Sequence, residues 1–280
     1  IGLGRMGRLH ARVYSQMPQA KLVGLYDVDR ASAEAAAREY GGRAFERLED
    51  LLDIVRAVTI AVPTVARLAA ARPALERSLA CLIEKPLARN VEECRQIAEL
   101  ARRHKALVQV GHIERFNPAV RAMEKLGVRP GFIEVVRVSP MTFRSIDVGV
   151  VLDMMIHDID IVLKLAQSPV KSIDAVGVSV IGEVEDIANA RVRFENGCVA
   201  NLTASRLAMK TERRLRIFSR DAYVSLDYQK RQAVVVNRGP NLAAVRDAVA
   251  RIRRGEIQDL SQLNFSKLVK IGRASCRERV

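Results

Sequence analysis

The chain has 280 residues, 49% of them hydrophobic and 28% charged, which is typical of a soluble globular protein with room for two domains. No apolar run approaches the ~18 residues of a membrane span, and four scattered cysteines without a C-x-x-C pair argue against a zinc site or a disulfide framework. The net charge of +14 comes from basic residues interleaved with acids, and aromatic residues make up only 4%, so we expect a cytoplasmic protein without nucleic-acid, membrane or metal partners.

The first part of the chain alternates between helical and strand-like patterns. Helices are predicted over residues 5–17, 29–39, 65–78 and 90–103, and strands over 20–26, 55–62, 79–83 and 106–110. Thr64 is placed to cap the helix at 65–78. This alternation predicts an α/β domain over residues 1–112, a Rossmann-type doubly wound parallel sheet with helices on both faces.

After Gly111 the pattern changes to few helices and many strands. Helices are predicted over 117–126 and 151–166, and strands over 132–138, 172–181, 187–194, 198–205, 213–218, 222–227 and 232–236. The Glu195-Asn196-Gly197 turn is a hairpin signature. We therefore expect a second, α+β domain over 113–271 with a largely antiparallel open sheet. An apolar open face of that sheet predicts a homodimer or homotetramer.

Both ends of the sequence look incomplete. The opening glycine turn has no room for the strand that should precede it, so we expect a truncated first strand and a weakly supported turn. Residues 272–280 have no apolar period and resemble the translation of a sequencing-library adapter. We expect this segment to be a non-native tail on a protein that is truncated at its carboxyl end.

The first seven residues contain a G-x-G-x-x-G turn. Gly2 permits a tight turn, Gly4 lets a pyrophosphate approach the backbone, and Gly7 allows close helix packing. The amide groups near Arg5 and Met6 would face the phosphates at the start of a helix. Such turns are followed by an acid about 20 residues later, and Asp27 occupies that position. Its carboxylate would bind a ribose 2′-hydroxyl, which favours NAD over NADP; alternatively, it only forms a turn.

A second motif, Glu84-Lys85-Pro86, follows a predicted strand. A lysine at the carboxyl end of a parallel strand lies in the ligand crevice of this fold. Its ammonium group could stabilise the charge that develops on a substrate hydroxyl as the proton leaves. The alternative is an ordinary surface turn.

A third motif places Asp153 and His157 four residues apart on one predicted helix. This spacing puts them on one face, among apolar neighbours that predict partial burial. An imidazole oriented by a carboxylate is a good proton acceptor at neutral pH. The alternatives are a helix-stabilising pair, or a metal site that uses Asp158 and Asp160.

Together these motifs, with Ala61-Val62-Pro63-Thr64 between them, resemble the Gfo/Idh/MocA oxidoreductases over residues 1–270. The resemblance implies that Lys85, Asp153 and His157 form the catalytic group. It also implies that Pro63, Thr64 and Glu84 join the glycine turn, Asp27 and Lys85 in the cofactor site. Family members often have His three residues after the threonine, where this chain has Arg67.

Residues 111–118, Gly-His-Ile-Glu-Arg-Phe-Asn-Pro, resemble a segment of family members that oxidise UDP-N-acetylglucosamine at C3. The resemblance implies that Arg115 and Asn117, with His157, lie near the substrate. The alternative is that Arg115 and Asn117 only start and cap the helix at 117–126.

The resulting hypothesis is an NAD-dependent dehydrogenase acting on a secondary alcohol of a sugar or nucleotide sugar, with the C3 hydroxyl of UDP-N-acetylglucosamine as the best candidate. His157 would take the hydroxyl proton, Asp153 would hold the imidazole, and Lys85 would stabilise the alkoxide. Inositol or a simple sugar is the alternative substrate. A non-catalytic dinucleotide-binding regulator would need the glycine turn but not these three side chains.

Overall fold

The computed structural model describes residues 1–142, 148–220, 222–230, 232–237, 250–256 and 270–275. The chain divides into two compact units, Ile1–His112 and Ile113–Val280. Within the described residues, no helix combines the length and the apolar character that crossing a membrane requires.

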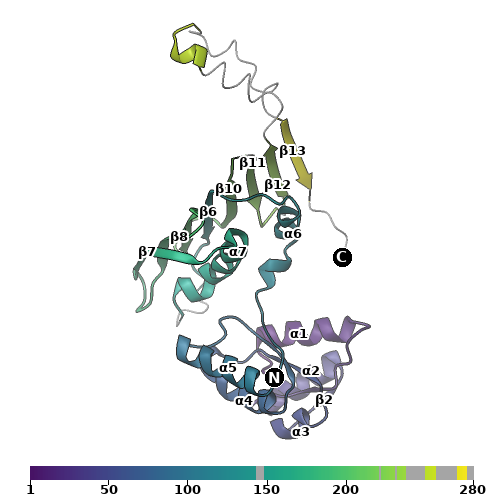
Figure 1. Ribbon diagram of the computed structural model, residues 1–280. Helices are drawn as coiled ribbons and strands as arrows, with labels where there is room; N and C mark the ends of the chain where they lie inside the picture. Colours follow the sequence, from purple (N-terminus) through teal and green to yellow (C-terminus); the bar gives the residue numbers. More distant parts are fainter. Residues whose placement is uncertain (143–147, 221, 231, 238–249, 257–269, 276–280) are drawn as a thin grey trace. The chain divides into compact units, whose positions relative to one another are not determined.

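Unit 1 is a parallel α/β domain (Figure 1). Its elements are α1 Arg5–Gln16, β1 Gly24–Leu25, α2 Arg30–Tyr40, β2 Arg43–Ala44, α3 Leu48–Leu52, β3 Ala57–Ile60, the 3-10 turn η1 Thr64–Ala66, α4 Arg67–Glu76, β4 Ala80–Ile83, α5 Val91–Arg103 and β5 Val108–Val110. β1 pairs in parallel with β2, and β3, β4 and β5 form a second parallel sheet. This confirms the predicted Rossmann-type fold.

Small and branched apolar residues explain the packing of unit 1. One cluster joins α4 and α5 to strands β3 and β4 through Leu75, Ile97, Ile60 and Ile83, all fully buried. A second, smaller cluster packs the alanines of α1 and α2 near Leu25 of β1. Alanine lets a helix backbone lie close to its neighbours, which accounts for the close packing of α1 and α2 in this cluster.

Three local predictions for unit 1 were wrong. The strand expected over 20–26 shortens to Gly24–Leu25 because its partner β2 is itself two residues long. β2 and α3 lie where no element was expected. Thr64 does not cap α4, since it already lies inside the turn η1, whose hydrogen bond runs from the Ala66 N–H to the Pro63 carbonyl.

Unit 2 is built on an eight-stranded sheet in the order β13-β12-β11-β10-β6-β9-β8-β7. Its elements are the 3-10 turn η2 Ile113–Phe116, α6 Pro118–Glu124, β6 Phe132–Val138, the π-helical turn η3 Val151–Met155, α7 Ile156–Ala166, β7 Val170–Val178, β8 Ile187–Phe194, β9 Val199–Ser205, β10 Glu212–Phe218, β11 Ala222–Asp227, β12 Gln232–Asn237 and β13 Lys270–Ser275. Neighbouring strands are antiparallel except for β6 and β9. The prediction of a largely antiparallel sheet is confirmed.

Helices α6 and α7 share one core with the sheet (Figure 1). Met123 of α6 and Ile161 of α7 belong to the same buried cluster as Ile133 and Leu215 of the strands. The helix expected over 151–166 opens as the π turn η3 before becoming α-helical. The expected tail at 272–280 overlaps β13, its last five residues lie outside the described residues, and its non-native origin stays a prediction.

Candidate functional site

The glycine turn forms a cradle that side chains could not share. Gly2 has a φ of +82°, and a Cβ there would lie 2.8 Å from the Val62 nitrogen. A Cβ on Gly7 would lie 1.8 Å from the Gly2 carbonyl oxygen. At Gly4, the N-cap of α1, a Cβ would meet no atom within 4 Å. The backbone is therefore tightly packed at Gly2 and Gly7, whereas the space beside Gly4 is open.

The amino end of α1 can receive an anion. No side chain caps this helix and no acidic residue stands in its first turn. The unpaired amide groups of a first turn and the helix dipole together attract phosphate. The cradle above Gly4 is the space in which a pyrophosphate would meet these amides.

The turn is anchored on both sides, more firmly than the sequence led us to expect. The Ile1 nitrogen donates to the Thr59 carbonyl at 2.8 Å, and the Ala61 N–H donates to the Ile1 carbonyl at 2.9 Å. On the other side, the Gly2 N–H donates to the Tyr26 carbonyl at 2.9 Å. Ile1 and Gly2 thereby connect the segment of β1 to that of β3.

Asp27 braces this turn as well. Its Oδ2 accepts from the Leu3 N–H at 2.5 Å, and its Oδ1 accepts from the Asp29 N–H at 2.9 Å. A carboxylate has about four acceptor positions, so two remain for ribose hydroxyls. Asp27 both forms the turn and keeps the capacity that the cofactor prediction requires.

Glu84 is a buried carboxylate at the end of β4, next to Lys85. It accepts from His10 Nε2 of α1 at 2.8 Å and from the Lys85 N–H at 3.2 Å. Burial alone would raise the pKa of Glu84, but the hydrogen bond and charge of His10, the Lys85 N–H and the Arg67 charge hold it below its ordinary value. Gly111 makes room, because a Cβ there would lie 3.2 Å from the carboxylate.

His10 was not identified from the sequence. It lies three residues after Gly7 on α1, so it shares the helix face that packs toward the strand ends. That spacing was the available clue. Through His10, the helix of the glycine turn is hydrogen-bonded to the residue that precedes Lys85.

Arg67 lies at the start of α4, beside Pro63 and Thr64. Its side chain is buried and its Nε donates to the Val62 carbonyl at 3.2 Å. Burial lowers the pKa of Arg67, against the opposing charge of Glu84. Among the described residues, its buried Nη1 has no hydrogen-bond partner. An unsatisfied buried donor beside the glycine cradle fits a ligand rich in oxygen acceptors, such as a dinucleotide.

In unit 2, Asp153 lies in η3 and His157 in the first turn of α7, and both are partly buried as predicted. Asp158 is almost fully buried and forms a bidentate pair with Arg137 at 2.7 and 2.8 Å. Burial raises the pKa of Asp158, and Arg137 opposes that shift.

The carboxylates considered for a metal site are both paired with arginines. Asp158 binds Arg137, and Asp160 binds Arg115 through two contacts of 2.6 Å. Each pair presents the carboxylate to a guanidinium rather than to an open cavity. This arrangement does not fit the metal alternative for α7.

Arg115 and Asn117 have structural partners. Asn117 is the N-cap of α6, where its Oδ1 accepts from the Ala119 N–H at 3.0 Å. Its Nδ2 donates to Glu114 at 3.3 Å. Arg115 ties the turn η2 to α7 through Asp160. These contacts are the ones expected of the capping alternative, while a role toward substrate stays a prediction.

The predicted site residues are thus distributed over both units. Unit 1 holds the glycine turn, Asp27, Pro63, Thr64, Glu84 and Lys85, and unit 2 holds Arg115, Asn117, Asp153 and His157. His10 and Arg67 join the unit 1 group through the contacts described above.

Comparisons with known proteins identify two family domains in the chain. Residues 1–112 match the family described as "Oxidoreductase family, NAD-binding Rossmann fold", and residues 138–225 match the GFO/IDH/MocA C-terminal domain. The chain is 35% identical to UDP-N-acetylglucosamine 3-dehydrogenase of Acidithiobacillus ferrooxidans over 92% of its own length and 85% of that enzyme. A solved structure of the same enzyme superposes with a TM-score of 0.86, at 31% identity, covering 100% of this chain and 82% of that one.

Other similar proteins carry the names of different dehydrogenases. The scyllo-inositol 2-dehydrogenase (NAD(+)) of Bacillus subtilis is 30% identical over 74% of this chain and 66% of that protein. A levoglucosan dehydrogenase in complex with NADH and levoglucosan shares the fold, with a TM-score of 0.76 at 22% identity, over 84% of this chain and 74% of that one.

Proposed function

This chain belongs to the Gfo/Idh/MocA family of NAD-dependent oxidoreductases, and from that premise we propose that it oxidises the C3 hydroxyl of UDP-N-acetylglucosamine. The observation that carries the cofactor assignment is the cradle above Gly4, open at an uncapped helix end and flanked by Asp27. The similarity to the Acidithiobacillus enzyme along 92% of the chain supports the substrate.

The residues of unit 1 would hold NAD, which when bound supplies the carbon that accepts hydride. Gly2, Gly4, Arg5, Met6 and Gly7 receive the phosphates, and Asp27 binds ribose hydroxyls. Pro63, Thr64, Glu84 and Lys85 complete the cofactor site. Arg67 Nη1 offers a further donor beside them.

Three side chains would perform the protein's share of the chemistry. His157 takes the proton of the substrate hydroxyl, and Asp153 orients the imidazole and stabilises its protonated form. The Lys85 ammonium group stabilises the developing alkoxide. Arg115 and Asn117 lie on the segment before α6 and would border the sugar.

Substrate choice is tested by turnover with NAD. We expect UDP-N-acetylglucosamine to give a kcat/KM at least about 100-fold above that of myo-inositol, because burying additional polar contacts to a nucleotide contributes several kcal/mol. Higher turnover with myo-inositol would contradict the nucleotide-sugar assignment and favour the inositol alternative. If neither compound supports the reduction of NAD, both substrates are excluded.

We also propose a homodimer or homotetramer formed through the sheet of unit 2, in the cytoplasm. Strand β7 exposes apolar side chains, including Ile173, Val176 and Val178. The thiols of Cys81, Cys94 and Cys198 are free, which is compatible with a reducing compartment.

A further inference from the structure

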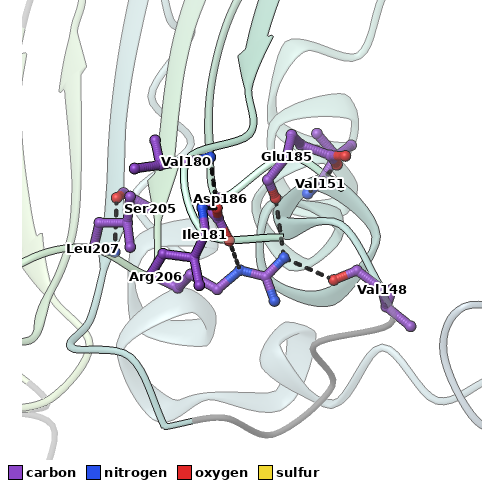
Figure 2. Close-up of polar contacts among 9 residues, drawn as sticks. All are labelled: Val148, Val151, Val180, Ile181, Glu185, Asp186, Ser205, Arg206 and Leu207. Carbon is purple, nitrogen blue, oxygen red and sulfur yellow. Dashed lines mark hydrogen bonds and ion pairs between the residues drawn. The ribbon is translucent and has the colours of Figure 1, made fainter. Parts of the chain in front are cut away.

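We propose that Arg206, Asp186 and Glu185 are positioning residues that hold the start of the helix bearing Asp153 and His157. The inference rests on the catalytic roles proposed above for Asp153 and His157. Glu185 and Asp186 lie just before β8 and Arg206 just after β9, all far from η3 in sequence. Glu185 and Arg206 contact the segment Val148–Val151, and Asp186 pairs with Arg206 (Figure 2).

The centre of this cluster is a buried ion pair. Arg206 Nε lies 3.0 Å from Asp186 Oδ1, and both side chains are at least nine-tenths buried. The other oxygen of Asp186 accepts from the backbone N–H groups of Val180 and Ile181 at 2.9 and 2.7 Å. These backbone bonds, with Arg206, hold the pKa of Asp186 below its ordinary value, so the carboxylate stays charged.

The same guanidinium reaches the entrance of η3. Arg206 Nη2 donates to the Val148 carbonyl at 2.9 Å and to the Glu185 carbonyl at 3.0 Å (Figure 2). One rigid, planar donor group therefore binds both the segment that leads into the helix and Glu185, the residue that contacts this segment.

Glu185 completes the attachment. Its carbonyl accepts from the Val150 N–H at 2.9 Å, and its Oε1 accepts from the Val151 N–H at 3.1 Å. This carboxylate therefore binds the Val151 amide at the amino end of η3, where negative charge is favoured. Gly149 leaves the necessary space, since a Cβ there would lie 2.1 Å from Oε1.

The attachment sets the position of Asp153 directly. The Asp153 N–H donates to the Gly149 carbonyl at 3.0 Å. Gly149, which lies against the Glu185 carboxylate, therefore also begins the turn that carries Asp153. Stability alone does not explain the buried pair of Arg206 and Asp186, because proteins with hydrophobic residues in place of such a pair are often equally stable. Arg206 also binds the segment just before η3, and π turns are frequent at functional sites. We infer that the cluster fixes the register of Asp153 and, through α7, the orientation of His157.

The test uses the full chain and three substitutions. Glu185→Ala removes the acceptor for Val151, Gly149→Ala forces the carboxylate away, and Glu185→Gln keeps an amide oxygen at the same place. We expect Glu185→Ala and Gly149→Ala to lower kcat about tenfold with NAD affinity unchanged, and Glu185→Gln to restore kcat to within about twofold. Glu195→Ala, at an exposed hairpin position, is the matched control.

A double variant separates positioning from folding. If Glu185 acts through Asp153, adding Glu185→Ala to Asp153→Asn lowers kcat less than twofold further, whereas independent effects would multiply. Wild-type kcat in Glu185→Ala, or full multiplication in the double variant, overturns the inference. His157→Asn is measured alongside: if it retains turnover, the proposed catalytic roles fail. If it is inactive while Glu185→Ala is unaffected, only the positioning role fails.

Discussion

Glu84 illustrates how one buried side chain can organise a site. Its ionised form is stabilised in the folded protein, because its pKa lies below its ordinary value despite burial. This stabilisation is present above the unfolded pKa of about 4.3 and is lost as the pH falls through the lower folded value.

We therefore predict that Glu84→Gln destabilises the protein by about 1–3 kcal/mol at pH 7, since His10 and the Lys85 N–H lose a charged acceptor. The difference from wild type should shrink as the pH falls below 4. Urea unfolding of both proteins at pH 7 and pH 3.5 measures it. A difference that is equal at the two pH values would show that the charge of Glu84 contributes nothing.

The proposed catalytic side chains give a second prediction at the residue scale. His157→Ala and Lys85→Ala should each lower kcat by about 10²–10⁴-fold, the usual contribution of a positioned proton acceptor or charge stabiliser. NAD affinity, measured by fluorescence titration, should stay within a few-fold of wild type because the glycine cradle is unchanged. Lys21→Ala, at an exposed position, is the control. Near-normal turnover in both variants would remove the assignment.

At the scale of elements, α1 and its turn allow a test of the cofactor cradle. Gly4→Ala introduces a methyl group into open space, so the melting temperature should hardly change. NAD affinity should still fall at least about tenfold, because the methyl group occupies the predicted pyrophosphate position. Gly7→Ala should also destabilise unit 1, since its Cβ would collide with the Gly2 carbonyl. Gly182→Ala, likewise in open space, serves as control.

The elements also show where sequence reasoning is sufficient. Strands β6, β8 and β11 have the predicted bounds because their alternating burial imprints a period of two on the sequence. The π turn η3 could not be predicted in this way. Five residues are too few to separate its period from 3.6, and its contacts come from Glu185 and Arg206, remote in sequence. The contacts of His10 and Arg67 could not be predicted for the same reason, since their partners are set by tertiary packing.

For the whole molecule, the proposed activity needs both units, since Lys85 belongs to unit 1 and His157 to unit 2. Through family resemblance, the order of the motifs in the sequence predicts that these side chains act in one reaction. Composition and spacing alone left each motif with a structural alternative. The capping contact of Asn117 shows that such an alternative can be realised in the fold.

Assembly is the property of the whole molecule that the sheet of unit 2 lets us test. Strand β7 is an edge strand, and its side chains Ile173 and Val176 are 64% and 61% exposed. An apolar edge left open in a stable protein is usually covered by a partner. We predict that the protein sediments as a dimer or tetramer and that Val176→Lys shifts it toward monomer.

Analytical ultracentrifugation of Val176→Lys, with Val28→Lys as the control variant, measures this effect. Val28 is 94% exposed in unit 1, so its substitution adds the same charge away from the sheet of unit 2. Dissociation by Val176→Lys alone would place the interface at β7. If both variants keep the wild-type mass, the edge of β7 does not form the contact. If both dissociate, the added charge rather than its position is responsible.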